Sequence, residues 1–343
     1  MILVEILAVA IVLLLGVAVL GWAERRVMGL VQFRWGPNRV GPFGLLQPIA
    51  DGVKFLAKED VIPEDAHRFI FILAPALSFA TAICSFGVIP YGPTVRIAGR
   101  TIDLVILDLD GGLLFWWAAT SLGVYGIVCA GWSSRSKYSL IGGLRSSAQM
   151  VSYELALSLS VIGIPLISGT MRPVEIVNQQ AGGILNWNVF SGWQPLGLLL
   201  FIIAGFAETN RLPFDLPEAE TELVAGYHTE YSSLKLLMFY LAEYISMMTM
   251  AAMATTLFLG GYQLPVPDEW LGLEPGWPLW SLQILMFVLK AGFLVFLFIW
   301  VRWTLPRFRY DQLMNLGWKR LFPLALANVI VTAILVALNV IPR

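Results

Sequence analysis

The sequence has 343 residues, of which 58% are hydrophobic and 13% charged, and its 22 basic and 23 acidic residues give a net charge of −1. A mean hydropathy of +0.75 excludes an ordinary soluble domain and is typical of an integral membrane protein. The sequence shows no repeat of fixed period and no soluble extension, so we expect a single polytopic membrane domain over residues 1–343. We expect no nucleic-acid partner.

Apolar runs of the length that crosses a bilayer, about 17–25 residues, recur along the whole chain. The sequence therefore predicts an all-α integral membrane protein with about eight transmembrane helices. The runs cover residues 2–23, 68–90, 113–131, 150–168, 194–209, 236–260, 282–301 and 321–341. The first run lacks a basic leader and is ended by Arg25 and Arg26, so we interpret it as a retained helix and not as a secretory signal.

The basic residues predict how the helices are oriented. If the first span starts outside, the connections 24–68, 132–149, 208–235 and 302–320 are cytoplasmic, and they hold 17 of the 22 Lys and Arg residues. Cytoplasmic loops of membrane proteins carry such an excess. We therefore expect both termini on the outer, periplasmic side.

The first cytoplasmic connection has a basic and aromatic part followed by a helical part. The first part contains Arg25, Arg26, Phe33, Arg34, Trp35 and Arg39. In the second part, polar residues recur at helical spacing opposite an apolar stripe of Leu45, Ile49, Val53 and Leu56; the polar ones are Gln47, Asp51, Lys54 and Lys58. This pattern predicts an amphipathic helix in the membrane interface. The helix either anchors the chain among lipid headgroups or covers the entry of an amphiphile into the protein.

Ionisable residues fall inside or at the edge of later spans, where a charge is costly. They are Glu154, Glu208, Glu243 and Lys290, and Arg145 and Gln149 precede the first of them at the membrane edge. Such groups usually face the interior of the bundle or a wet cavity. We interpret the carboxyls as candidate proton carriers. The alternative is a structural pairing between helices, and this alternative is stronger for Lys290 than for Glu243.

The third cytoplasmic connection is strongly acidic. Between Glu208 and Glu230 only Arg211 opposes six carboxylates, which are Glu208, Asp215, Glu218, Glu220, Glu222 and Glu230. This composition indicates a place where protons or negative charge are handled beside the bilayer.

The last connection instead alternates basic residues with Trp303, Phe308, Tyr310 and Trp318. It either anchors in the headgroups or docks a peripheral subunit.

The chain lacks the residues that hold the common redox groups. Cys84 and Cys129 lie in separate predicted spans and are too few for an iron–sulfur site of four thiolates. His67 and His228 fall at span ends or in loops, which makes paired haem ligation implausible, and no glycine-rich nucleotide fingerprint follows a strand. We expect no catalytic residue, metal or cofactor on this chain alone, so electrons must come from a partner.

The sequence resembles the H-subunit family of proton-translocating NADH–quinone oxidoreductase, respiratory complex I, which has a homologue in the first NADH dehydrogenase subunit of mitochondria. The segments that carry the resemblance are, in order, ERRVMGLVQFRWGPNRVGPFGLLQPIADGVKFLAKED, GLRSSAQMVSYE, AETNRLPFDLPEAETELVAGYHTEY, LAEY and VRWTLPRFRYDQLM. Together with the eight runs they cover nearly the whole chain.

The resemblance implies a subunit of the membrane arm that binds quinone, with ubiquinone as the expected substrate. It assigns to a quinone chamber the residues Arg25, Arg34, Asp51, Lys54, Arg211, Phe214 and Asp215. It assigns to a proton-coupling path the residues Glu154, Glu208, Glu218, Glu220, Glu222 and Glu243. It further implies FMN and iron–sulfur clusters in partner subunits, contacts with peripheral-arm and small membrane subunits and with lipid, and a bacterial or mitochondrial inner membrane.

Three alternatives stay open. The chain could be the equivalent subunit of a membrane-bound hydrogenase, and quinone-dependent activity would decide between the two. It could be a secondary transporter with an ion site at Glu154, Glu243 and Lys290, although no inverted halves are visible in the sequence. It could also be a structural scaffold, which would leave the intramembrane acids without a role.

Overall fold

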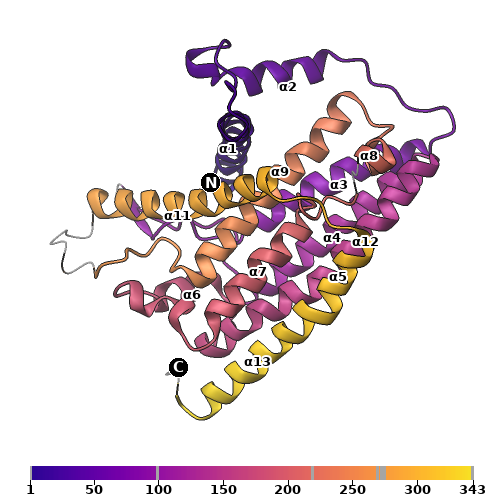
Figure 1. The fold of residues 1–343 in the computed structure, drawn as a ribbon. Coiled ribbons are helices and arrows are strands. Elements are labelled where there is room, and N and C mark those ends of the chain that lie inside the picture. The colour runs from indigo at the N-terminus through magenta and orange to yellow at the C-terminus, as the bar shows by residue number, and fades with distance from the viewer. Residues whose placement is uncertain (1, 98–99, 218–219, 268–269, 271–275, 341–343) are drawn as a thin grey trace.

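The computed structural model describes residues 2–340 except 98–99, 218–219, 268–269 and 271–275. Long helices dominate it (Figure 1), which confirms the all-α fold class. They are α1 (Ile2–Val31), α3 (Arg68–Phe86), α4 (Gly112–Ser133), α5 (Lys137–Ser168), α7 (Gln194–Glu208), α9 (Ser233–Phe258), α11 (Trp277–Thr304) and α13 (Phe322–Ala337).

Six helical segments of the described chain are long and apolar enough to cross a membrane. They are α3, α4, α5, α9, α11 and the segment Tyr310–Ala337. In the last of these, α12 (Tyr310–Leu316) continues into α13 through a π-helical turn, η5 (Gly317–Leu321). Helix α7 is shorter and apolar, and α1 is 30 residues long. The chain is thus a multi-pass membrane protein, and the number eight stays a prediction.

Helix α5 is much longer than the apolar run that predicted it. It begins at Lys137 instead of residue 150, because Ser139, Ser146 and Gln149 are fully buried against other elements. The apolar run could not show this, since the buried face of that first part is polar. The sequence also did not predict the short antiparallel hairpin of β1 (Val95–Ile97) and β2 (Arg100–Ile102), in which Val95 lies opposite Ile102.

The bundle core lies where α4, α5, α7 and α9 meet. Trp116, Tyr153, Phe201 and Phe258 are almost entirely buried there. Small residues let the helices approach closely, as is common in membranes. At Gly131 of α4, an added Cβ would lie 3.1 Å from the Cα of Gly143 in α5. Helix α13 packs along the other side of α5, as Figure 1 shows.

Short elements connect the long helices. On one side of the bundle are η1 (Pro42–Gly44), α2 (Gln47–Ala57), α8 (Glu220–Leu223) and η4 (Gly226–His228). Among the connections of the other ends are α6 (Pro173–Gln179), η2 (Ile184–Asn186) and η3 (Asn188–Phe190). Helix α2 is the helix predicted in the first connection, and it lies beside the end of α1 (Figure 1) and contacts the first part of α9, where Ser233 donates to the carbonyl of Phe55 at 3.0 Å.

Lys290 of α11 is buried and is bound by backbone oxygens. Its Nζ donates to the carbonyl oxygens of Leu259 (2.7 Å), Gly261 (3.0 Å) and Gln263 (2.7 Å), just beyond the end of α9. The ammonium also lies 3.9 Å from the ring centroid of Trp187. These contacts satisfy all three donors of the ammonium and support the structural interpretation of Lys290.

Candidate functional site

A buried ionic cluster joins α1, α9, α11 and the turn after α7. At its centre, Nη1 of Arg211 donates to Oε2 of Glu24 at 3.0 Å. Nε of Arg211 lies 2.8 Å from Oε1 of Glu243, as an ion pair without the alignment of a hydrogen bond. Arg302 donates to the other oxygen of Glu24, and Tyr244 donates to Oε2 at 2.7 Å. We call these five residues the Arg211 cluster.

The charges of the Arg211 cluster balance one another, as their burial requires. Two carboxylates meet two guanidinium groups, and the Arg211 guanidinium also stacks 4.5 Å from the ring centroid of Tyr244. The side chain of Arg211 is 0% exposed and that of Glu24 is 5% exposed. A buried charge is tolerated only when it is paired and hydrogen-bonded. Each member therefore depends on the others.

The end of α7 places Arg211 in the bundle. Glu208 is the last residue of the helix, and Asn210 has a left-handed backbone conformation with φ of 51°, which is a common way to end a helix. The chain then turns, and the amide of Arg211 donates back to the carbonyl of Phe206 at 3.3 Å. The guanidinium consequently points toward α1 and α9.

The acidic connection is held against the link between α11 and α12. Phe214 is buried, with its ring 5.3 Å from that of Tyr153 and 5.4 Å from that of Phe308, centroid to centroid. Asp215 pairs with Arg307 at 3.3 Å. The aromatic and basic residues of the last connection thus bind this chain's own acidic segment, at least in part.

A second polar group joins α1 to α2. Nη1 of Arg25 lies 2.5 Å from Oδ2 of Asp51, Gln47 donates to Oδ1 at 3.0 Å, and Lys54 lies 3.7 Å away. Burial opposes ionisation of Asp51, but the hydrogen bonds from Arg25 and Gln47 and the nearby positive charges outweigh it, and its pKa is lowered. Asp51 is thus a stable anion at neutral pH.

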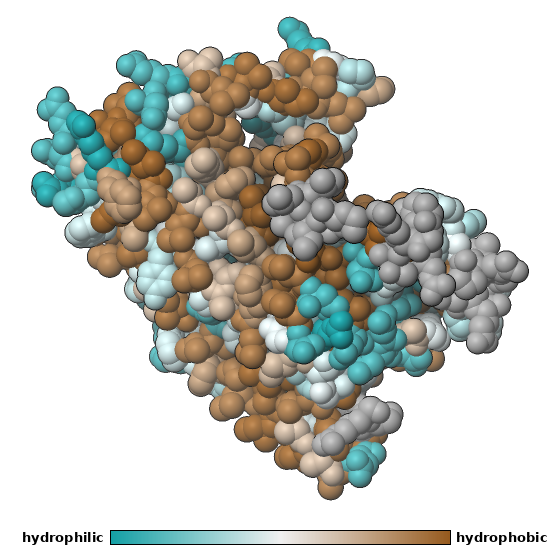
Figure 2. Space-filling view, turned by 180° about the vertical axis from the view of Figure 1, so that it is seen from behind, coloured by the Kyte–Doolittle hydropathy of each residue, from teal (hydrophilic) through white to brown (hydrophobic). Residues whose placement is uncertain are grey.

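The structure therefore places six of the seven proposed chamber residues in two neighbouring groups. Arg25, Asp51 and Lys54 form one, and Arg211, Phe214 and Asp215 belong to the other. Adjacent residues of α1 connect them, because Glu24 faces Arg211 while Arg25 faces Asp51. Arg34 is exposed and donates to Gln32 within its own connection (2.8 Å). Figure 2 shows a hollow under α2 at the top of the molecule.

Two of the proposed path carboxylates line one cavity inside the bundle. Glu208 and Glu243 both border it, and its volume is about 70 Å³, enough for a few water molecules. Glu154 lies within electrostatic range of Glu208 and accepts a hydrogen bond from Ser121. The structure thus brings Glu154, Glu208 and Glu243 into one region.

The remaining path carboxylates are less closely joined to this region. Glu222 is exposed and accepts a hydrogen bond from Arg145 at 2.7 Å, which ties α8 to the start of α5. Glu220 lies in α8, and Glu218 lies outside the described residues. In the same connection His228 is buried, and this burial lowers its pKa to about 4.

Sequence reasoning did not single out Glu24 or Tyr244. A signal for Glu24 does exist in helical periodicity. Leu13 and Val17 are buried on α1, and Glu24 follows Val17 by seven residues, so it lies on the same face. An acidic residue on the buried face of a span is a functional candidate. Tyr244 has no such signal, because only tertiary contact gives its hydroxyl a partner.

Comparison with known proteins matches almost the full chain. The NADH dehydrogenase family matches residues 4–333. An H subunit of NADH-quinone oxidoreductase from Koribacter versatilis is 52% identical over 347 residues, which is 98% of this chain and 97% of that protein. NADH-quinone oxidoreductase subunit 8 of Rhodothermus marinus is 52% identical, covering 95% and 94%. The corresponding H subunit of Salinibacter ruber is 50% identical, covering 96% and 93%.

Proposed function

The chain belongs to the NADH dehydrogenase family of complex I H subunits, and we propose that it helps to form the quinone chamber and couples quinone reduction to proton translocation through its carboxylates. Membership makes it a membrane subunit of an oxidoreductase complex. In our proposal the chain lies in an inner membrane with both termini outside, and partner subunits supply FMN, iron–sulfur clusters and electrons.

The surroundings of α2 support the quinone chamber. A quinone joins a polar carbonyl head to an apolar tail and so needs both kinds of surface. Asp51 and Lys54 give α2 a charged side, to which Arg25 of α1 adds its guanidinium, whereas Ile49 and Val53 are exposed apolar residues of α2. The Arg25 and Lys54 side chains are 49% and 76% exposed, which leaves them accessible to the peripheral-arm subunits that we propose complete the chamber.

One observation carries the proposed coupling: Arg211 contacts Glu24 beside the chamber and Glu243 beside the cavity. Reduction of a quinone to a quinol takes up two electrons and two protons, which changes the charge in the chamber. A shift of Arg211 toward Glu24 would weaken its pairing with Glu243 and favour protonation of Glu243. Glu243 lines the same cavity as Glu208, and Glu154 acts electrostatically on Glu208, so in our proposal the change passes from Glu243 to Glu208 and Glu154.

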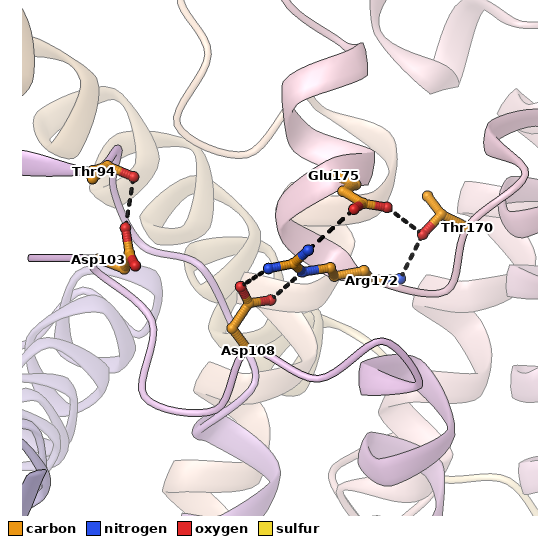
Figure 3. Close-up of polar contacts among 6 residues, drawn as sticks. All are labelled: Thr94, Asp103, Asp108, Thr170, Arg172 and Glu175. Atoms are coloured by element: carbon orange, nitrogen blue, oxygen red, sulfur yellow. Dashed lines mark hydrogen bonds and ion pairs between the residues drawn. The ribbon is translucent and has the colours of Figure 1, made fainter.

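Substitutions at the two ends of this route test the proposal. In purified complex, Asp215→Ala and Glu208→Gln should each reduce NADH:quinone turnover by about tenfold or more, while the assembled amount on native gels stays unchanged. Glu175→Gln is the matched control, because Glu175 pairs with Arg172 at 3.2 Å and belongs to neither the proposed chamber nor the proposed path (Figure 3). Normal turnover in well-assembled Asp215→Ala and Glu208→Gln complexes would overturn the proposal.

A further inference from the structure

A second cavity, larger than the one that Glu208 and Glu243 line, lies at the end of the bundle opposite α2. Its volume is about 420 Å³, which is in the range of small-molecule sites, about 300–1,000 Å³. Its walls come from the connection between α3 and α4, from α6, from the turn after α9 and from the first part of α11. We call it the Asp103 cavity. No residue that the structure places in its lining belongs to the proposed chamber or the proposed path.

Two carboxylates border the Asp103 cavity. Asp103 and Asp108 both belong to the connection between α3 and α4 (Figure 3). Arg172 binds both oxygens of Asp108, whereas no ion pair joins Asp103 to a described basic residue. Asp103 is exposed and accepts a hydrogen bond from Thr94 at 2.7 Å. The cavity thus has at its edge a carboxylate whose charge is not neutralised within the described part of the chain.

The charge of Asp103 acts on the wall of the cavity. Burial and the charge of Asp103 raise the pKa of Tyr262 to about 12, so this hydroxyl stays protonated at neutral pH. It donates to Oδ1 of Asn178 at 2.8 Å, and its oxygen remains an acceptor. The Asp103 cavity therefore offers oxygen acceptors close to a negative charge, which favours a cation.

Two buried amides line the same cavity. Gln263 and Gln283 are 8% and 5% exposed, and no hydrogen bond joins either side-chain amide to another described residue. Burying an amide without a partner costs about 1–3 kcal/mol. Lys290 holds the backbone of Gln263 in place, because its Nζ donates to the Gln263 carbonyl at 2.7 Å. The amides therefore point to a ligand that both donates and accepts hydrogen bonds.

The lining also indicates which kind of cation fits. A metal ion does not, since the described residues contain no group of three His, Cys, Asp or Glu side chains suited to one. A quaternary ammonium is typically bound by a cage of aromatic rings, and Tyr262 is the one aromatic residue among the described residues of the lining. A primary ammonium instead donates three hydrogen bonds, which carboxylate, hydroxyl and amide oxygens accept.

We propose that the Asp103 cavity binds a small polar ligand with a primary ammonium group, which Asp103 pairs with, while the amides of Gln263 and Gln283 bind the ligand's oxygen atoms. The phosphoethanolamine headgroup of a membrane lipid has this chemistry, and so does free glycerophosphoethanolamine. Gln283 lies less than two helical turns after the exposed Trp277 in α11, and tryptophan is typical of the membrane interface. A lipid and a soluble molecule can therefore both reach the cavity. The inference is independent of the quinone and coupling functions proposed above.

The test measures how well a ligand shields the cavity from chemical labelling. Ala181 is exposed and lines the cavity, so Ala181→Cys in the purified complex places a thiol there. Its rate of reaction with the neutral thiol reagent methyl methanethiosulfonate is followed by peptide mass spectrometry in phosphatidylcholine nanodiscs. Glycerophosphoethanolamine is the soluble probe, and nanodiscs that also contain phosphatidylethanolamine supply the lipid probe.

We expect one or both probes to slow the labelling of this thiol. At about four times its Kd, a bound probe should slow labelling about fivefold. Glycerophosphocholine is the matched control compound, because its quaternary ammonium has no N–H donor, and it should give no protection.

Two carboxylates of one connection provide matched variants. Asp103→Asn keeps the acceptor for Thr94 and removes the charge, so it should raise the amount of probe that halves the labelling rate by about fivefold. Asp110→Asn removes an exposed carboxylate that is not among the lining residues and should not change this amount. Gln283→Leu removes a buried amide and should raise it by about tenfold. All three variants should keep parental NADH:quinone turnover, which shows that the complex is intact.

The pattern of protection also identifies the source of the ligand. Protection by phosphatidylethanolamine alone would support a bound lipid headgroup, whereas protection by glycerophosphoethanolamine would support a site open to free amines. Three results would overturn the proposal: no protection by either probe, equal protection by glycerophosphocholine, or equal effects of Asp103→Asn and Asp110→Asn.

Discussion

The molecule contains two arginine clusters of similar composition in very different surroundings. In the Arg211 cluster an arginine meets Glu24 and Glu243 inside the bundle. In the other, Arg172 at the start of α6 meets Asp108 and Glu175, and Thr170 also binds Glu175 (Figure 3). We call the second one the Arg172 cluster. The side chain of Arg211 is 0% exposed and that of Arg172 is 35% exposed.

Burial decides what each cluster can do. Water and salt screen the charges around Arg172, so its ion pairs mainly order the connection before α6. Around Arg211 little water is available to replace a lost ionic partner. A change in the charge of one group therefore changes the interactions of its neighbours. The Arg172 cluster therefore stabilises one connection locally, whereas the Arg211 cluster can couple changes between helices.

The strongest test of this contrast removes the central charge. Arg211→Met should destabilise the subunit by about 3–5 kcal/mol, because Glu24 and Glu243 would keep buried charges without their shared partner. We expect poor assembly on native gels and a lower thermal unfolding midpoint of the complex. Arg172→Met is the control and should assemble normally. Equal behaviour of the two variants would remove the basis of the comparison.

A milder change keeps the volume and removes one negative charge. Glu24→Gln should cost about 2–3 kcal/mol, since it weakens charge-assisted hydrogen bonds from Arg211, Arg302 and Tyr244. Because Glu24 also joins the two groups of chamber residues, turnover with quinone should fall even in the fraction that assembles. NADH:quinone activity per assembled complex measures this. Glu175→Gln, in the Arg172 cluster, should retain full activity.

The pH dependence of stability tests burial at His228, beside the rings of Tyr227 and Tyr240. Its pKa of about 4 in the folded chain lies below the value of about 6.5 in an unfolded chain. As the pH falls from 6.5 to 5, the unfolded chain takes up a proton and the folded chain does not, which lowers stability by about 2 kcal/mol. Thermal midpoints between pH 7.5 and 5 should fall less in His228→Gln. Parallel curves for both proteins would contradict the assignment.

The smallest effect is expected at the partly exposed pair of Arg25 and Asp51. Asp51→Asn should leave assembly unchanged and raise the KM for quinone by about two- to fivefold, as befits a screened pair. The lowered pKa of Asp51 means that its ionic contribution is complete above about pH 4 and is lost only at lower pH. The KM ratio between variant and parent should therefore stay constant from pH 6 to 8. A ratio that changes in this window would show that another group controls it.

Much of the fold follows directly from the sequence. Apolar runs of bilayer length predicted the long helices, since a chain in lipid must satisfy its backbone internally. Periodicity predicted α2, and five motif segments spread along the chain led to the family. The early start of α5 was not predicted, because serine and glutamine on its buried face hide the helix from an apolar search.

The sequence by itself determined that this is a helical membrane protein of the H-subunit family and that its carboxylates are concentrated near one connection. Only the tertiary structure decided which charges meet. Glu24 pairs with Arg211, which is 187 positions away in the sequence. Glu208 and Glu243 line one cavity, and Lys290 donates hydrogen bonds to backbone carbonyls. The physical reason is that helix periodicity fixes the face on which a residue lies, whereas its partner depends on how separate helices pack.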